Sequence, residues 1–498
     1  MNSLYESIQK KLRKIADIQY SCAVLQWDQE TYMPKNGYEF RSEQIATLSG
    51  IAHELFTEKK LEEDLLELMS VKGLDEKEEK NISLILEELE KQKKLSSDFV
   101  ERSSKAVSDC FQKWNKAREE NKAEIYLPSL EKLIEIKKEE IQLLGFKEHP
   151  YDALLNQYEK GITVQQLDKL FSSVREQLHP LLKKIYDYHS PDDSFFYQSF
   201  DKNLQWSFGI SLLRQMGYDF DSGRQDISAH PFTINFSPQD VRVTTRIDEN
   251  NLSEMIWSCI HEGGHALYEQ GLVAYEYGMP LGEAISLGIH ESQSRLWENQ
   301  VGRSESYWIH HYKELKNIFP QQLKEVSEKQ FYHACNKVQP SLIRTNADEL
   351  TYHFHILIRY ELEKALFIGD LKVSELKGAW NDLYQKELGI VVPDDRQGIL
   401  QDVHWSHGSF GYFPTYSLGS FYAAQFYQTA EKEITDLSHN LKEGKFDTLL
   451  DWLRTKIHRH GKFYSAQELC KKISGEELKF DYFLTYAQKK YQGIYNFT

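Results

Sequence analysis

Two histidines and a glutamate stand in the pattern HEGGH at residues 261–265, a spacing that suits the binding of a metal ion. On a helix, residues four apart project from one face, so the imidazoles of His261 and His265 can bind one ion together. Glu262 falls beside them, where it can take a proton from metal-bound water, whose pKa the ion lowers to about 7. It can then protonate a leaving amine. The pattern predicts metal-dependent peptide hydrolysis with Glu262 as the general base.

The surroundings of the motif strengthen this prediction. The residues just before it are apolar, among them Met255 and Ile256, which predicts a buried helix over 252–270. Buried histidines need polar partners, and a metal ion supplies them. Gly263 and Gly264 each cost a helix roughly 1 kcal/mol relative to alanine. We therefore expect a substrate or a neighbouring helix to approach the backbone closely at these glycines.

A third ligand is expected from a glutamate on the next helix, and four candidates follow the motif: Glu269, Glu283, Glu291 and Glu298. Glu269 lies too close to His265 to reach back to the same ion. Glu283 stands at a helix start, where carboxylates are common. Glu291 lies near mid-helix, 26 residues after His265 (291 − 265), close to the separation in helical gluzincin peptidases. Glu291 is the predicted ligand. The fourth candidate is expected to support the ligands, and His290 is expected to point elsewhere.

Apolar residues recur at three- and four-residue steps along most of the chain, the period of an amphipathic helix. Helices are predicted over residues 4–33, 40–69, 75–121, 127–144, 164–188, 203–216, 252–270, 281–301, 307–318, most of 327–388 and 421–495. Residues 232–247 instead alternate β-branched and polar side chains, which predicts a β-hairpin. Many gluzincin peptidases place an edge strand here to hold an extended substrate.

These elements predict a mainly α fold with a small β-hairpin or sheet beside the metal site. We expect one large helical domain over residues 1–498, with long N-terminal helices over 1–125 and a catalytic core over 226–420. The chain shows neither internal repeats nor a Pro/Ser-rich linker that would divide it.

Composition excludes several classes of function. Sixty Lys and Arg against 76 Asp and Glu give a formal charge of −16, which disfavours binding to nucleic acids and anionic membranes. We expect no secretory signal and no segment with the roughly 20 apolar residues that span a bilayer. The five cysteines are scattered, without a Cys-x-x-Cys pair, and are expected to be free thiols. A cytoplasmic protein is predicted.

Further short motifs accompany HEGGH in a fixed order: HPF at 230–232, DVRVT at 240–244, HESQ at 290–293, IRTNAD at 343–348 and GILQDVHW at 398–405. With segments 25–34 and 150–161, they make nearly the whole chain resemble the thermostable carboxypeptidases of the carboxypeptidase Taq type. One departure is Lys160, where we would expect proline. Each motif alone is weak, but six in order are specific.

The resemblance implies a nearly all-helical gluzincin fold with a deep central groove and a homodimer. It implies one divalent metal ion per chain, Zn²⁺ or Co²⁺. It also implies a peptide hydrolase that removes C-terminal residues one at a time with broad specificity.

A carboxypeptidase must recognise a terminal carboxylate, and a bidentate arginine does so best. Arg344 is the first candidate and Arg242 the second. The other interpretation of Arg344 is an internal salt bridge with Asp348, four residues on, and the two roles are compatible. His230 is expected to contact the substrate backbone or its C-terminus, and Asp240 to orient its neighbours.

The tetrahedral transition state carries an oxyanion that needs hydrogen-bond donors. A Gly- and aromatic-rich segment contains His404 and Tyr416, whose placement resembles the donors of angiotensin-converting-enzyme-like and thimet-oligopeptidase-like folds. Tyr416 is the preferred oxyanion donor, and His404 is expected to donate to the transition state or to a substrate amide. His407 and Tyr412 are substitutes, and Asp402 is expected to orient its neighbours.

Two other functions compete with a carboxypeptidase. An oligopeptidase would cut internal bonds with the same metal chemistry and without a clamp for the terminal carboxylate. A helical scaffold with a vestigial site is a different class of protein. The intact His261, Glu262, His265 and Glu291 argue against that last alternative.

Overall fold

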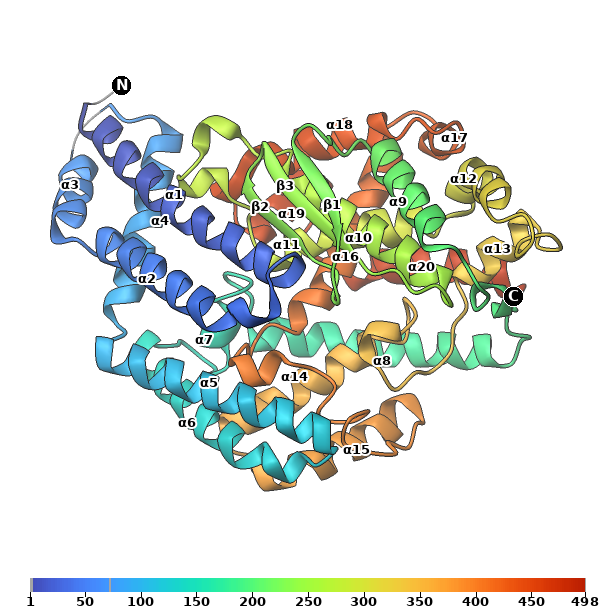
Figure 1. Cartoon of the computed structure of the whole chain (residues 1–498), viewed down its shortest axis with the longest axis horizontal. Coiled ribbons are helices and arrows are strands. Elements are labelled where there is room, and N and C mark those ends of the chain that lie inside the picture. Colours follow the sequence, from blue (N-terminus) through green and yellow to red (C-terminus); the bar gives the residue numbers. More distant parts are fainter. Residues whose placement is uncertain (1–2, 71–72, 498) are drawn as a thin grey trace. The chain divides into compact units, whose positions relative to one another are not determined.

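The structure is a computed structural model that describes residues 3–70 and 73–497 (Figure 1). The chain divides into two compact units, each built from three segments. The first unit comprises Met1–Gln92, Asp192–Cys335 and Tyr422–Glu477, and the second comprises Lys93–Pro191, Asn336–Phe421 and Leu478–Thr498. The mainly α fold is confirmed, whereas a single domain over 1–498 stays a prediction.

Helices make up most of both units. Those of the first unit are α1 (Ser3–Thr31), α2 (Tyr38–Phe56), α3 (Lys59–Met69), α4 (Glu76–Lys93), α9 (Lys202–Met216), α10 (Leu252–Glu269), α11 (Leu287–Arg295), α12 (Glu305–Ile318), α13 (Glu328–Cys335), α17 (Leu437–Lys442), α18 (Asp447–Lys456) and α19 (Ala466–Ser474). Those of the second are α5 (Ser97–Glu120), α6 (Leu127–Leu144), α7 (Asp152–Leu155), α8 (Val164–Tyr186), α14 (Tyr352–Ile368), α15 (Leu376–Leu388) and α20 (Phe480–Tyr495). The boundary at Phe421 falls inside α16 (Pro414–Glu433).

Several long predicted helices are interrupted, and at Ser96 a local side-chain cap competes with the helix. The predicted run 75–121 is two helices, because the Ser96 hydroxyl accepts from the Phe99 N–H at 3.2 Å and starts α5 there. The run 40–69 is likewise divided into α2 and α3, and 327–388 and 421–495 are broken into shorter helices. Hydrophobic periodicity continues across such breaks, and it therefore overestimated helix length.

The helix predicted over 281–301 starts late and ends in an unusual form. Residues Pro280–Gly282 form a short 3₁₀ turn, η5, and Ser286 caps the start of α11 by accepting from the Ile289 N–H at 3.1 Å. After α11 the chain continues as a π-helix, η6 (Leu296–Gly302). Such segments are often found at functional sites.

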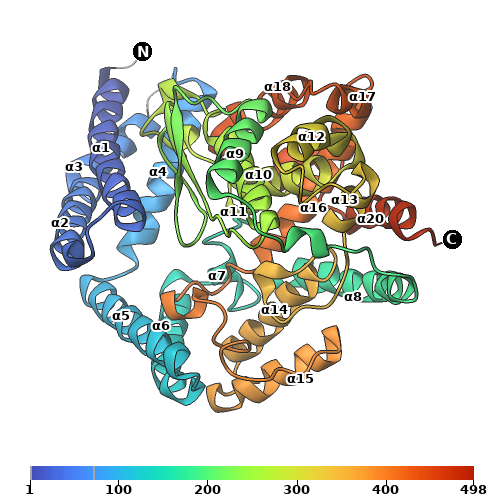
Figure 2. The same cartoon turned by 45° about the vertical axis from the view of Figure 1, so that its right-hand side comes forward.

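A three-stranded sheet lies beside the metal-motif helix. The predicted hairpin is confirmed as β2 (Thr233–Ser237) paired antiparallel with β3 (Asp240–Thr245). A further strand, β1 (Gly223–Ile227), pairs parallel with the other edge of β3, so the order is β1-β3-β2. Its sequence, GRQDI, carries little β-branched signal and was not predicted. Figure 2 shows the sheet between α1 on one side and α9 and α10 on the other.

The two glycines of the motif allow α10 to pack closely against its neighbours. A Cβ on Gly263 would lie 2.7 Å from the Leu213 side chain of α9. A Cβ on Gly264 would lie 2.7 Å from both the Gln293 carbonyl oxygen and the Ser294 Cα of α11. The expected close approach of a neighbouring helix is thus observed, and it brings α11 against the motif.

Replacing Gly264 by Ala is expected to lower the free energy of unfolding by about 1–3 kcal/mol, because backbone atoms of α11 occupy the space and must move. The control is Gly378→Ala on α15, where a Cβ would meet no atom within 4 Å. There alanine is expected to raise stability by up to about 1 kcal/mol through its helix propensity. Thermal unfolding midpoints of both variants test the pair. Equal shifts would contradict close packing at Gly264.

Two smaller predictions concern the chain as a whole. All five cysteines are free and buried, as expected of unpaired thiols. Within residues 3–70 and 73–497, every helix is too short or too polar to cross a membrane.

Candidate active site

Three side chains in the first unit form a cluster that can hold a metal ion. His261 and His265 extend from α10 and Glu291 from α11, and one ligand atom from each lies within 4.8 Å of the others. The Nε2 atoms of His261 and His265 are 3.7 Å and 3.4 Å from the same carboxylate oxygen of Glu291. Two imidazole nitrogens and one carboxylate oxygen are the donor set of catalytic zinc sites that keep a position open. The residues therefore fit a divalent ion.

The carboxylate of Glu291 is kept ionised by its neighbours. Arg295 donates through Nε to Oε1 at 2.6 Å, and the Ser294 hydroxyl donates to Oε2 at 3.1 Å. Burial alone would raise the pKa of Glu291, but Arg295, His261 and His265 outweigh burial and hold the pKa well below its usual value. The carboxylate is therefore charged at neutral pH and suited to bind a cation.

Glu298 orients the first histidine from the π-helix η6. Its Oε2 lies 2.9 Å from Nδ1 of His261, which leaves Nε2 of that ring facing Glu291. Arg295 and Arg303 each donate to Glu298 at 3.2 Å. A carboxylate on the outer nitrogen of a ligand histidine fixes the ring and raises its basicity. The supporting role expected of Glu298 fits this geometry.

His290 and Glu269 orient the second histidine. Nδ1 of His290 makes a hydrogen bond with Nδ1 of His265, and Nε2 of His290 lies 2.8 Å from Oε1 of Glu269. Asn235 of β2 in turn donates to Glu269. Burial, and after it His290, lowers the pKa of His265 to about 3, so the ring is in the neutral form that binds metals.

The expectation that His290 points elsewhere was wrong. Sequence spacing places residues 290 and 291 on different sides of α11, but α10 and α11 pack so closely at Gly264 that both residues contact α10. The position of Glu269 could have indicated this contact from the sequence. Glu269 lies one turn beyond His265, too close to bind the same ion, but its carboxylate reaches His290, which contacts His265.

The predicted general base is held by the sheet. Glu262 is buried, with 8% of its surface exposed, and its Oε2 accepts a hydrogen bond from Thr233 Oγ1 at 2.6 Å. Burial raises the pKa of Glu262 above its ordinary value, an effect partly offset by His261 and Thr233. Thr233 is the first residue of β2, and sequence reasoning did not single it out.

Two predicted substrate-binding residues lie on β3 and pair with each other. Arg242 donates to both carboxylate oxygens of Asp240 at 2.9 Å, and its guanidinium lies 4.4 Å from the Trp27 ring centre and 4.8 Å from that of Phe236. Asp240 therefore holds the Arg242 guanidinium in one orientation. His230 is exposed in the loop before β2, and its carbonyl accepts from the Ser228 hydroxyl at 2.6 Å.

Arg344 lies in the second unit and forms a salt bridge with Asp402, not with Asp348. Its Nε donates to Asp402 at 3.0 Å, and Nη1 donates to the Tyr352 hydroxyl at 3.1 Å. The salt bridge to Asp348 was wrong, because that carboxylate accepts from the Thr351 and Leu350 N–H groups and caps the turn before α14. Arg344 sits in a short 3₁₀ turn, η7 (Arg344–Asn346), so the helical spacing assumed for the pair does not hold.

The predicted oxyanion donors also lie in the second unit and contact each other. Nε2 of His404, in the 3₁₀ turn η9 (His404–His407), is 3.1 Å from the hydroxyl of Tyr416 at the start of α16. The Arg344 guanidinium lies 4.9 Å from the centre of the Tyr416 ring. Burial, and after it Arg344, lowers the pKa of His404 to about 3. The imidazole is therefore neutral.

The two substitutes for these donors differ in their surroundings. The Tyr412 ring lies 5.3 Å from that of Tyr416 and 5.2 Å from that of Tyr158. His407 packs against Phe111, with ring centres 4.8 Å apart. The second unit thus brings Arg344, His404, Tyr412 and Tyr416 into one cluster, with Asp402 binding the arginine as an orienting residue.

Comparison with known proteins places nearly the whole chain in one family. A family model described as carboxypeptidase Taq (M32) metallopeptidase matches residues 7–491. Carboxypeptidase 1 of Bacillus subtilis is 40% identical over 97% of both chains, and thermostable carboxypeptidase 1 of Thermus thermophilus is 38% identical over 99% of both. The crystal structure of an M32 carboxypeptidase from Deinococcus radiodurans R1 is 35% identical, covers 100% of both chains and superimposes with a TM-score of 0.98.

Proposed function

The chain belongs to the carboxypeptidase Taq (M32) metallopeptidase family and is a metallocarboxypeptidase, and on this premise we propose that it shortens peptides of broad sequence by one C-terminal residue at a time. We propose Zn²⁺ as the ion, with Co²⁺ as an alternative, held by His261, His265 and Glu291. The observation that carries the proposal is the convergence of these three side chains within 4.8 Å.

Glu262 is the residue of this chain that moves protons in the proposed mechanism. A divalent ion in the site would supply the activation of a water molecule, whose pKa it lowers to about 7. Oε2 of Glu262 already accepts from Thr233, which leaves Oε1 to take the proton of the attacking water. The same oxygen then delivers the proton to the leaving amine. Burial of Glu262 supports this role, because a raised pKa suits a group that both accepts and donates a proton.

The binding of the substrate is part of the proposal. Arg344 is the first candidate for the terminal carboxylate and Arg242 the second, and each is held in one orientation by an aspartate. We propose Tyr416 as the oxyanion donor and His404 as a donor to the transition state. Their mutual hydrogen bond supports this pair, since it fixes the direction of the phenol.

Further contacts to the peptide are proposed for Tyr412, His407 and His230. We also propose a homodimer in the cytoplasm. The net charge of −16 supports peptides rather than nucleic acids as partners.

A peptide with a free C-terminus is expected to be shortened stepwise, and its C-terminal amide to react about 10- to 100-fold more slowly. The amide removes the charge-assisted hydrogen bonds to the clamp, each of which contributes about 1.5–3 kcal/mol. Mass spectrometry of the digest measures both rates, and an N-acetylated peptide serves as the control for the other end. Equal rates for the acid and the amide would favour an oligopeptidase instead.

A further inference from the structure

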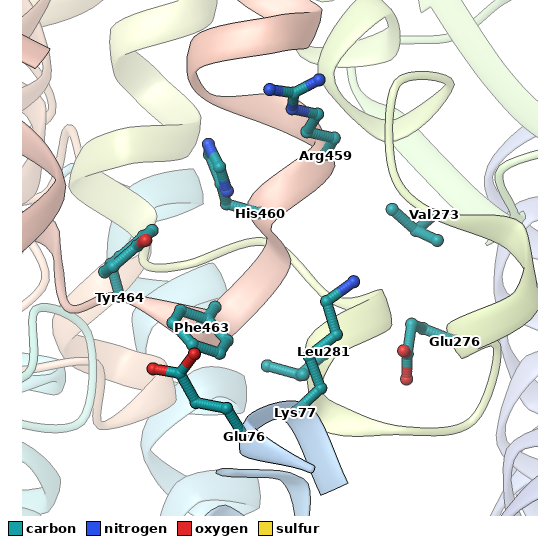
Figure 3. A pocket seen from close by; sticks show the side chains of 9 residues that line it. All are labelled: Glu76, Lys77, Val273, Glu276, Leu281, Arg459, His460, Phe463 and Tyr464. Carbon is teal, nitrogen blue, oxygen red and sulfur yellow. The ribbon is translucent and has the colours of Figure 1, made fainter.

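A cavity of about 320 Å³ lies in the first unit, and none of the predicted metal ligands lines it. Three parts of the chain form its walls: the start of α4, the connection between α10 and α11, and the 3₁₀ segment η10 (His458–Phe463). Figure 3 shows Arg459 at one end of the view and Glu76 at the other, with Phe463 and Leu281 between them. The volume is that of a small-ligand site.

The walls of the cavity are fixed by buried contacts. Asn81, which is fully buried, donates to the carboxylate of Glu276 at 3.2 Å and accepts from the Leu281 N–H at 3.1 Å. Gly461 has a φ of +47°, and a Cβ there would lie 1.8 Å from the Leu281 carbonyl oxygen. The η10 segment is therefore in backbone contact with the opposite wall. These contacts fix the backbone of the walls, so ligand binding need not order the chain itself.

Two carboxylates, two permanently charged basic groups and His460, whose pKa burial lowers, line the cavity. Glu76 and Glu276 are acidic, and Lys77 and Arg459 are basic. Lys77 donates to the Tyr275 hydroxyl at 3.1 Å, and Glu276 is held by Asn81. Across residues 3–70 and 73–497, by contrast, no side chain forms an ion pair or hydrogen bond with the Arg459 guanidinium or the Glu76 carboxylate. Both side chains are exposed, so one unpaired and solvent-accessible charge of each sign lines the cavity.

We propose that this cavity is a second binding site for a short peptide with both termini free. Arg459 binds the terminal carboxylate, Glu76 binds the terminal ammonium group, and the apolar surface of Leu281 and Phe463 contacts the side chains. A guanidinium is well suited to a carboxylate because it donates two parallel hydrogen bonds. The choice of ligand rests on the proposed function, because short peptides are what a carboxypeptidase leaves behind.

Titration calorimetry of the metal-loaded Glu262→Gln protein with leucyl-leucine tests the proposal. We expect two binding events, one at the metal centre and one at the cavity. Arg459→Gln and Glu76→Gln, each added to this background, are expected to weaken the second event at least about ten-fold, as loss of a charge-assisted hydrogen bond does. Arg246→Gln is the matched control, since Arg246 pairs with Glu254 away from the cavity.

Two derivatives of leucyl-leucine, each lacking one terminal charge, show which charge of the peptide each cavity side chain binds. N-acetyl-leucyl-leucine is expected to bind the cavity weakly and to be insensitive to Glu76→Gln, whereas leucyl-leucine amide is expected to be insensitive to Arg459→Gln. A single event that both cavity variants leave unchanged would overturn the proposal. Chromatography of the probe is run in parallel: cleavage by the Glu262→Gln protein would count against the proposed mechanism and not against the second site.

Discussion

Replacing Glu262 by Gln is expected to lower kcat for peptide hydrolysis about 10³-fold while the protein keeps its metal ion. The amide has nearly the shape of the carboxylate and can still accept from Thr233, so the fold and the three ligands are preserved. The amide cannot accept the proton of the attacking water, and general base catalysis contributes about 10²–10⁴-fold. Steady-state kinetics and metal analysis of the same sample measure both quantities.

Glu254→Gln is the control for this variant. Glu254 lies in the first turn of the same helix, α10, and pairs with Arg246 at 3.2 Å, so the substitution makes the same chemical change outside the site. We expect its kcat to equal that of the unmodified protein. Undiminished hydrolysis by metal-loaded Glu262→Gln protein would exclude Glu262 as the base.

Removing the metal ion is expected to abolish hydrolysis, and one equivalent of Zn²⁺ or Co²⁺ per chain to restore it. His261, His265 and Glu291 place one ligand atom each within 4.8 Å of one another, and within residues 3–70 and 73–497 they are the one group of this kind. Dialysis against a chelator followed by titration with each ion measures the stoichiometry. Persistent hydrolysis after complete removal of metal would contradict the site.

Glu291→Gln tests the same site from the protein side. The variant keeps an oxygen ligand but loses its charge, and we expect the Kd for the ion to rise more than about 100-fold, because even the loss of a partner behind a ligand costs about 10- to 100-fold. Glu283→Gln is the control. Glu283 lies in the connection before α11 and pairs with Lys462, so the same chemical change is made outside the site. If Glu291→Gln and Glu283→Gln bound the ion equally well, Glu291 would not be a ligand.

Much of the metal centre could be predicted from the sequence because it depends on local geometry. His261 and His265 lie four residues apart on a helix whose apolar period is plain, and any helix with that spacing presents both rings on one face. Glu291 required only the next helix and a connection that reverses the chain. The β-hairpin before α10 was predicted for the same reason, since strand alternation and its turn are local patterns.

The lengths of helices were harder to predict. The caps at Ser96 and Ser286 each use one hydroxyl and one N–H, whereas apolar residues on both sides keep the same period across the break. Strand β1 was missed because its stability comes from pairing with β3 and not from the β propensity of its own residues.

The partners that orient the site were decided by tertiary structure. Glu298 contacts His261, Thr233 contacts Glu262, and Asp402 rather than Asp348 binds Arg344. Each of these contacts joins residues separated by dozens of positions, and periodicity does not say which faces of two elements will meet. The sequence by itself therefore determined the family and predicted the candidate metal ligands and general base. Only packing, such as the close approach of α10 and α11 at Gly264, determined which side chains hold them in place.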